Sequence, residues 1–261
     1  MASEPGHPGR QAYNRWFLLG EKRNELLTLR EVQQYGRDTF GDPDHVSIYG
    51  LKPREWYARG MRILGRTAVE CTPDRLADLI GRDIAAVAQT VAAASPMVVD
   101  LFAGSGNTLS WITRHTGARR AIGFELDDVV FELASENLRI AGLGIDLRHD
   151  SYQHGLQSLG QPGEDLLIVF VSPPWGHALS EGSGLDLRRT QPPVAEAVDL
   201  TTAAIGHHKL LFAIHVWETV EPGSLAEVTA RFPWSAMKVY DINAPRQSPG
   251  LLLATWGWAV T

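Results

Sequence analysis

Residues 98–108 read Val-Val-Asp-Leu-Phe-Ala-Gly-Ser-Gly-Asn-Thr, and this stretch decides the fold of the chain. Its two valines predict a buried extended run. Gly104 and Gly106 then allow backbone angles, and a close approach of a ligand, that a Cβ would prevent. Asn107 or Thr108 is a suitable cap for a following helix. The stretch therefore predicts a strand, a tight glycine loop and a helix, which is typical of a ligand-binding turn, although an ordinary strand-to-helix connection has the same pattern.

Four short runs of the sequence that we expect to be strands end in polar or special residues. Asp100 ends the first run, Glu125 follows the second, Asp150 follows the third, and Ser-Pro-Pro-Trp at 172–175 follows the fourth. The carboxyl ends of parallel strands meet at one edge of an open sheet, and ligands bind at that edge. Glu125 is placed there to accept both hydroxyl hydrogens of a ribose, unless it is a solvated strand-end carboxylate. The order of these residues predicts a ligand site built from all four runs.

The part of the chain from 96 to 261 alternates expected strands and helices. This pattern predicts an α/β catalytic domain with a Rossmann-like, seven-stranded, mostly parallel sheet and helices on both faces. A Pro-containing connection at 243–250 favours a final antiparallel hairpin. We expect the strands near 97–101, 121–125, 145–149, 165–171, 209–217, 236–242 and 250–258, and the clearest helices over 127–141 and 193–205.

Residues 1–95 are expected to form a mainly helical N-terminal segment on the lid or substrate side of that domain. Its first residues, 1–11, are expected to be a flexible lead-in. A helix start is expected with Thr72 as N-cap and Pro73 at the first helical position. Between 54 and 66, arginines are interleaved with aromatic residues. That stretch predicts either a binding face or an amphipathic helix with a solvated basic side.

The composition narrows the class of protein and of ligand. The 261 residues are 44% hydrophobic and 21% charged, which suits one α/β domain with an appended segment. The net charge is −6, and residues 96–261 hold 11 Lys and Arg against 18 Asp and Glu. Because proteins that bind a long phosphate backbone usually carry a basic surface, this balance favours a small-molecule or nucleoside-like substrate, with RNA possible. We expect a cytoplasmic protein without a membrane partner, since no apolar stretch reaches about 18 residues.

Three further features invite functional interpretations. Cys71 is the only cysteine, so it is either a nucleophile or simply a small, partly buried thiol. The pair His207 and His208 has no acid or cysteine in register, and we expect no metal site. His215 and Glu218 end the fifth expected strand near the ligand edge. One of them could act as a base or contact substrate, or His215 could be a satisfied strand histidine.

Taken together, these motifs resemble the class I S-adenosylmethionine-dependent methyltransferases. The loop at 172–176 is similar to that of enzymes that methylate exocyclic amino nitrogens. The strongest resemblance is to the RNA cap guanine-N2 methyltransferases, also called trimethylguanosine synthases, whose D-x-F-x-G-x-G-G-N-T and V-V-F-L-S-P-P-W-G stretches are similar to 100–108 and 169–176. Upstream, 69–77 is similar to that family's S-V-T-P-E-x-I-A segment. Two departures are a missing glycine of the G-G-N triplet and His177 in place of a glycine.

The resemblance implies S-adenosyl-L-methionine as the cofactor and assigns roles to individual residues. Asp100 would orient the loop or meet the methionine ammonium, and Asp150 would accept from the adenine amino group or cap a helix. The implied cofactor contacts are Asp100, Phe102, Ala103, Gly104, Ser105, Gly106, Asn107, Thr108, Glu125, Leu126, Asp150 and Ser151. The implied catalytic residues are Ser172, Pro173, Pro174 and Trp175.

The chemistry of these residues fits methyl transfer to nitrogen. Because the transfer is an in-line displacement, alignment of the reacting atoms supplies most of the catalysis. Ser172 Oγ and the Pro173 carbonyl can each accept an N–H bond, and Trp175 can stack on a planar substrate, although the motif could also be a rigid surface turn. We expect a methyltransferase that acts on an amino nitrogen of a planar small molecule or nucleobase. The alternatives are an RNA guanine-N2 methyltransferase, a carbon or oxygen methyltransferase, and a cofactor-binding module without catalysis.

Overall fold

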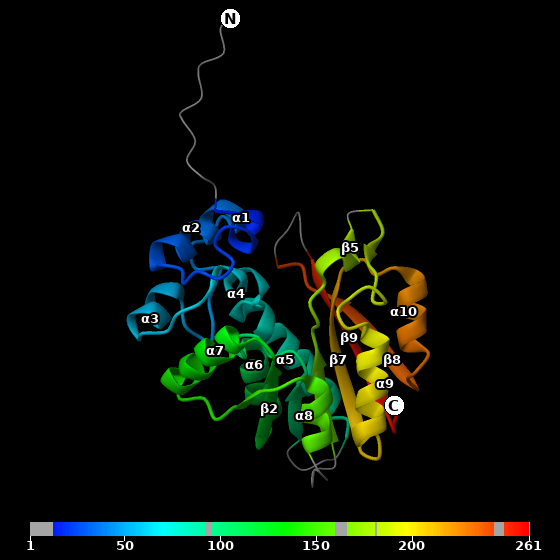
Figure 1. Ribbon diagram of the computed structural model, residues 1–261. Coiled ribbons are helices and arrows are strands. Elements are labelled where there is room, and N and C mark those ends of the chain that lie inside the picture. Colours follow the sequence, from blue (N-terminus) through cyan, green and yellow to red (C-terminus); the bar gives the residue numbers. More distant parts are fainter. Residues whose placement is uncertain (1–12, 92–95, 160–165, 181, 243–247, 261) are drawn as a thin grey trace, which may run out of the picture.

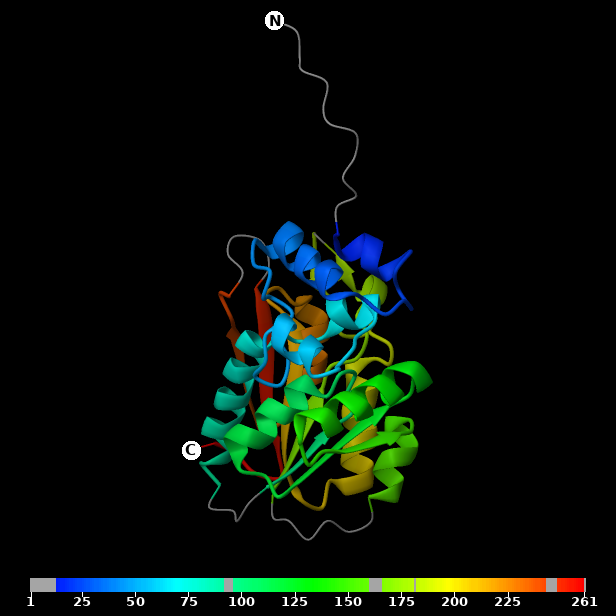
Figure 2. The same cartoon turned by 90° about the vertical axis from the view of Figure 1, so that its left-hand side faces the viewer.

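A seven-stranded sheet runs through the centre of the molecule, and helices cover both of its faces (Figures 1 and 2). The structure is a computed structural model that describes residues 13–91, 96–159, 166–180, 182–242 and 248–260. The strand order is β3-β2-β1-β4-β7-β9-β8. The strands of this sheet are β1 Met97–Asp100, β2 Arg120–Glu125, β3 Asp146–His149, β4 Leu166–Val171, β7 Lys209–Trp217, β8 Trp234–Val239 and β9 Pro249–Trp256.

The pairing of the strands confirms the expected topology. The first five strands in the sheet order are parallel, with Val98 of β1 opposite Ala121 of β2 and Ile168 of β4. The last strand, β9, is antiparallel to both β7 and β8, so the chain does close with a hairpin. Every residue of β4 is buried, as is typical of a parallel strand covered on both faces. The sheet is therefore mostly parallel with an antiparallel edge.

Ten α-helices lie in the described ranges. The expected helices over 127–141 and 193–205 are confirmed to within one residue at each end. None of the described helices is long and apolar enough to cross a membrane. The helices are α1 Arg15–Leu19, α2 Leu29–Phe40, α3 Pro53–Ala58, α4 Gly65–Glu70, α5 Asp74–Ala88, α6 Asn107–Thr116, α7 Asp128–Ala141, α8 Tyr152–Ser158, α9 Val194–Ile205 and α10 Pro222–Thr229.

Alternate residues of the strands send their side chains into two separate cores. On one face, Val169 and Phe212 pack with residues of α8, α9 and α10. On the other, Ile168 packs with α6 and with α5, whose Ile80 and Ile84 lie four residues apart on one helix face. Because α5 covers the sheet directly, the N-terminal part of the chain is joined to the sheet by apolar packing.

The helices α1 to α4 surround a third core. Leu18, Val32, Trp56 and Ile63 are buried there, together with Leu138 of α7. The Trp56 indole donates to the Val46 carbonyl oxygen at 3.0 Å. The arginine-rich stretch at 54–66 contains most of α3, a connection and the first residues of α4, and its Trp56, Met61 and Ile63 side chains are buried in this core. A single amphipathic helix does not span this stretch, and the binding face stays a prediction.

Two expected helix starts are wrong by one or two residues. Pro73 occupies the N-cap of α5 with extended backbone angles, and the first helical residue is Asp74, so Thr72 is not the cap. Helix α6 begins at Asn107 after Gly106 in the left-handed conformation, so neither expected cap residue fills that role. At α6, the Asn107 side chain does not cap the helix because its amide bonds to the backbone of Tyr49 and Thr72 instead. The expected lead-in at 1–11 and most of the connection at 243–250 lie outside the described residues.

Candidate functional site at the carboxyl edge of the sheet

The glycine loop after β1 has the conformation that its sequence predicts. Gly104 and Gly106 have backbone φ values of +52° and +72°, which residues with a Cβ rarely adopt. The Gly106 N–H donates to the Ala103 carbonyl oxygen at 2.7 Å and tightens the turn. Asp100 is 1% exposed and accepts the Phe102 N–H at 3.0 Å. Its carboxylate therefore orders the start of the loop.

Gly123 of β2 allows this loop to lie directly on the neighbouring strand. A Cβ at Gly123 would lie 2.7 Å from the Ala103 Cβ, closer than real Cβ atoms pack. The Ala103 N–H donates to the Phe124 carbonyl oxygen at 2.9 Å. Gly123 is a structural residue of this site that was not among the residues predicted from the sequence. The available signal was a glycine inside an apolar strand, which often marks a close backbone approach.

Glu125 ends β2 beside the glycine loop. Its Oε2 accepts the Gly104 N–H at 3.0 Å, and its Oε1 accepts the Asp127 N–H at 2.8 Å. Burial raises the pKa of the Glu125 carboxyl, and the two backbone donors oppose that shift. Arg66 of α4 binds Asp127 through Nη2 at 2.7 Å. The carboxylate is thus fixed at the sheet edge, with α4 held above it.

The residues that follow β3 lie next to Glu125. The Asp150 N–H donates to the Glu125 carbonyl oxygen at 3.1 Å, and Asp150 Oδ2 lies 2.6 Å from His154 Nδ1. Ser151 is the N-cap of α8, because its Oγ accepts the His154 N–H. Leu126 is 70% exposed although it is apolar. An acidic and an apolar side chain therefore flank Glu125 at the edge.

The buried amide of Asn107 ties the N-terminal segment to the loop. Its Oδ1 accepts the Tyr49 N–H at 2.7 Å, and its Nδ2 donates to the Thr72 carbonyl oxygen at 2.8 Å. The Tyr49 hydroxyl donates to the carbonyl oxygen of Ser105. Ser105, Asn107 and Thr108 are all buried. These side chains hold the loop in place from below.

The Ser-Pro-Pro-Trp residues follow β4 at the same edge. Ser172 Oγ lies 3.2 Å from Nδ1 of His215, which stands near the end of β7. The Trp175 ring lies 5.2 Å from the His215 ring and meets Trp217 edge-on at 5.9 Å. Pro173 is buried and Pro174 is exposed. The motif is thus backed by aromatic and imidazole rings from β7.

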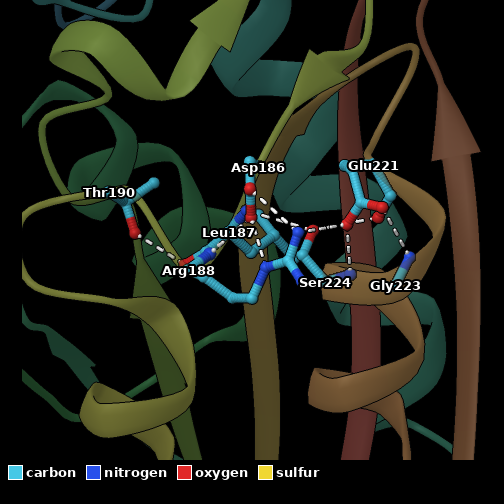
Figure 3. A network of polar contacts seen from close by, with 7 residues as sticks. All are labelled: Asp186, Leu187, Arg188, Thr190, Glu221, Gly223 and Ser224. Carbon is cyan, nitrogen blue, oxygen red and sulfur yellow. Dashed lines mark hydrogen bonds and ion pairs between the residues drawn. The ribbon is translucent and has the colours of Figure 1, made fainter.

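The chain between this motif and α9 makes an excursion that our sequence analysis did not predict. It contains a 3₁₀ turn, Gly176–Ala178, and the short pair β5 Leu179–Ser180 and β6 Gly184–Leu185. Figure 3 shows how this excursion is held: Arg188 binds Asp186 at 2.8 Å and Glu221 at 2.7 Å, and the buried Ser224 Oγ accepts the Leu187 N–H at 3.1 Å. Its far end returns to the motif, because the Gln191 N–H donates to the Pro174 carbonyl oxygen. The bonds from Arg188 to Glu221 and from Leu187 to Ser224 fix the excursion to the start of α10.

Burial shifts the pKa values of two groups at this edge. It raises the pKa of the Asp100 carboxyl to about 7, and the nearby Glu125 adds to the shift. It lowers the pKa of the His215 imidazole to about 4. His215 is consequently a neutral ring at physiological pH. Its Nε2 is buried and has no hydrogen-bond partner among the described residues.

The remaining candidates from the sequence are Cys71, the pair His207 and His208, and Glu218. Burial raises the pKa of the Cys71 thiol to about 12, which does not favour a nucleophile. The rings of His207 and His208 lie 4.0 Å apart, and the described residues contain no group of three or more His, Cys, Asp or Glu arranged for a metal. Glu218 is exposed. A small pocket beside the loop is lined by Arg62, Thr67, Ser105 and Asn137 among others, on the side facing α7.

Comparisons with known proteins identify the fold. No protein-family model matches the chain, and no curated protein matches it. Among solved structures, the methyltransferase domain of METTL16 has a TM-score of 0.51 at 13% sequence identity. The match covers 87% of this chain and 78% of the METTL16 chain. An S-adenosylmethionine-dependent methyltransferase from Agrobacterium tumefaciens has a TM-score of 0.46 at 16% identity, covering 76% and 67%. The B. subtilis tRNA methyltransferase TrmK has a TM-score of 0.45 at 15% identity, covering 69% and 65%.

The fold is therefore the Rossmann-like fold of the class I S-adenosylmethionine-dependent methyltransferases. The finer resemblance to trimethylguanosine synthases finds no support in these comparisons. The fold is compatible with many substrates, so the activity must be argued from the site.

Proposed function

We propose that this protein is an S-adenosylmethionine-dependent methyltransferase that methylates an amino nitrogen of a planar small molecule or nucleobase. One arrangement carries the proposal: Glu125 and the Gly104 loop lie on the same sheet edge as Ser172, His215 and Trp175. Glu125 and the Gly104 loop fit a nucleoside, whereas Ser172, His215 and Trp175 fit a flat amine. A sheet with this fold binds its ligands at that edge.

The residues around the glycine loop fit the proposed cofactor. A Cβ at Gly104 would meet no atom within 4 Å, so the space above the loop is open. Glu125 presents a carboxylate to ribose hydroxyls, and the exposed Leu126 presents an apolar surface to the adenine. Asp150 would accept from the adenine amino group, and Asp100, through the loop, would orient the methionine end. When bound, the cofactor supplies an electrophilic methyl group on a sulfonium.

The Ser-Pro-Pro-Trp residues would act on the methyl acceptor. The lone pair of a conjugated amine must localise as the nitrogen attacks, so positive charge builds there. Ser172 Oγ and the Pro173 carbonyl oxygen would accept the two N–H bonds and stabilise that charge. Trp175 would stack on the planar ring. Pro173 and Pro174 lack N–H donors and restrict the backbone, which keeps the acceptors in place.

The N-terminal segment, residues 1–95, would form a lid over the catalytic domain at 96–261. Helix α4 lies above the end of β2, because Arg66 binds Asp127. One feature favours RNA as a second candidate substrate. Trp16 of α1 is 79% exposed and stands next to the exposed Arg15, a pairing that suits a nucleic-acid base and phosphate. The acidic charge of the catalytic part favours the small molecule.

A labelled-methyl experiment tests the proposal. The protein is incubated with cofactor carrying an isotopically labelled methyl group and, separately, with RNA, DNA and a metabolite extract. Mass spectrometry then locates the methyl group. We expect it on an amino nitrogen. A methyl group on carbon or oxygen would contradict the amine mechanism, and cofactor binding without transfer to any pool would favour a binding module.

A further inference from the structure

The end of β7 brings a second polar side chain to the Ser-Pro-Pro-Trp motif. Strands β4 and β7 are parallel neighbours, with Val171 opposite Ile214, so the next residues of the two strands are Ser172 and His215. Their side chains meet, with Ser172 Oγ 3.2 Å from His215 Nδ1. The sheet register therefore fixes this pair, and no loop rearrangement is needed to form it.

The surroundings of the imidazole indicate which nitrogen carries its hydrogen. The ring is neutral, because burial depresses its pKa, so one nitrogen donates and the other accepts. Nε2 is buried without a partner among the described residues, and the Trp175 ring lies 5.2 Å from the His215 ring, tilted by 53° to it. Aromatic faces accept weakly from an N–H but offer nothing to a bare nitrogen. A hydrogen on Nε2 leaves Nδ1 as an acceptor.

We propose that His215 is a positioning residue that accepts the Ser172 hydroxyl hydrogen at Nδ1, so that Ser172 Oγ presents only lone pairs to the methyl acceptor. This inference rests on the proposed function. A serine held in this way accepts an N–H and cannot donate to the substrate. The pair therefore selects a nucleophile that carries N–H hydrogens. Without His215, the hydroxyl hydrogen would be free to turn towards the amine nitrogen and compete for its lone pair.

The tautomer of His215 can be measured without any substrate. The full chain is produced with ¹⁵N-labelled histidine, and the His215→Asn variant assigns the His215 signals. We expect the NMR spectrum at neutral pH to show a neutral ring with the hydrogen on Nε2. In Ser172→Ala, the Nδ1 signal should shift because its donor is gone. A hydrogen on Nδ1, or a charged ring, overturns the proposal.

A double-mutant cycle tests whether His215 acts through Ser172. The amine found in the labelled-methyl experiment is used with His215→Phe, Ser172→Ala and the double variant. We expect His215→Phe to lower turnover about tenfold with cofactor affinity unchanged, and the double variant to be no slower than Ser172→Ala. His215→Asn should restore most of the turnover, because its Oδ1 can stand near the position of Nδ1. Losses that multiply in the double variant would show that His215 does not act through Ser172.

The two experiments separate this proposal from the proposed function. If the wild-type chain transfers no methyl group to any amine, the proposed function fails, while the NMR spectrum still decides whether Ser172 donates to His215. If transfer occurs and the hydrogen lies on Nδ1, the function stands and the positioning role fails.

Discussion

The Glu125 carboxylate accepts the Gly104 N–H at 3.0 Å, which joins the end of β2 to the loop after β1. The same carboxylate accepts the Asp127 N–H through its other oxygen. Both acceptor oxygens still have a free lone pair for ligand hydroxyls. The contact thus fixes the orientation of a group that we propose to bind the ribose.

Glu125→Gln is expected to weaken S-adenosylmethionine binding by about tenfold or more. The amide keeps one acceptor oxygen for the loop, but it replaces the other acceptor with a donor and removes the charge. Isothermal titration calorimetry measures the affinity. Glu132→Gln, on the exposed side of α7, is the matched control and should bind as the wild type does. Equal affinities in the two variants would remove Glu125 from the cofactor site.

Ser172→Ala is expected to lower turnover by about tenfold or more and to leave cofactor affinity nearly unchanged. The hydroxyl is proposed to stabilise charge that develops only as the nitrogen attacks, so its loss acts on the transition state. Steady-state rates and calorimetry measure the two quantities. Ser158→Ala, at the exposed end of α8, is the control. A large loss of cofactor affinity in Ser172→Ala would place the serine in the cofactor site instead.

Gly123→Ala is expected to destabilise the protein by about 1–3 kcal/mol. The new methyl group would lie 2.7 Å from the Ala103 Cβ and would push the loop away from β2. The free energy of unfolding from urea denaturation measures the effect. Gly144→Ala is the control, because a Cβ there meets no atom within 4 Å. If the two variants are equally stable, the contact of loop and strand is not tight.

Much of this edge could be predicted from the sequence because each contribution is local. An apolar run that ends in Asp100 or Glu125 indicates both a strand and its polar end. The pairing of Ser172 with His215 depends on β4 lying beside β7, which the linear sequence does not specify. In the sequence His215 had several interpretations, and the structure adds the contact with Ser172.

The N-terminal segment shows a second limit of sequence analysis. Asn107 was a plausible helix cap by residue type. In the folded chain its amide instead bonds to Tyr49 and Thr72, which are remote in sequence. Trp56 similarly lies in a core shared with α7, so its arginine neighbours gave no guide to its role. Local patterns fail where tertiary contacts decide the position of a side chain.

The buried carboxyl of Asp100 should make folding stability depend on pH. Its pKa rises from the ordinary 3.8 to about 7 on folding, so the folded state binds the proton more tightly than the unfolded state. The contribution of this group to the free energy of unfolding therefore declines as pH rises between those two values. Asp100→Asn keeps an oxygen for the Phe102 N–H and does not titrate. We expect a smaller decline than in the wild type.

Urea denaturation at a series of pH values between 3.8 and 7 measures this difference. Other buried carboxyls, including Glu125, contribute to both proteins, so the difference between the two curves isolates Asp100. Asp241→Asn, at an exposed position, is the control and should reproduce the wild-type curve. A variant curve parallel to the wild type over this range would show that Asp100 titrates normally.

Ser224→Ala is expected to loosen the excursion between Pro174 and α9. Ser224 is 0% exposed, and its Oγ accepts the Leu187 N–H, which would lose its partner in a buried site. The cost is about 1–3 kcal/mol in the free energy of unfolding. Arg188→Ala removes a half-exposed ion pair with Glu221 of the same network and should cost under about 1 kcal/mol. Urea denaturation gives both values, and limited proteolysis should cut the excursion faster in Ser224→Ala. The reverse order of the two variants would mean that the surface ion pair, rather than the buried hydroxyl, holds the excursion.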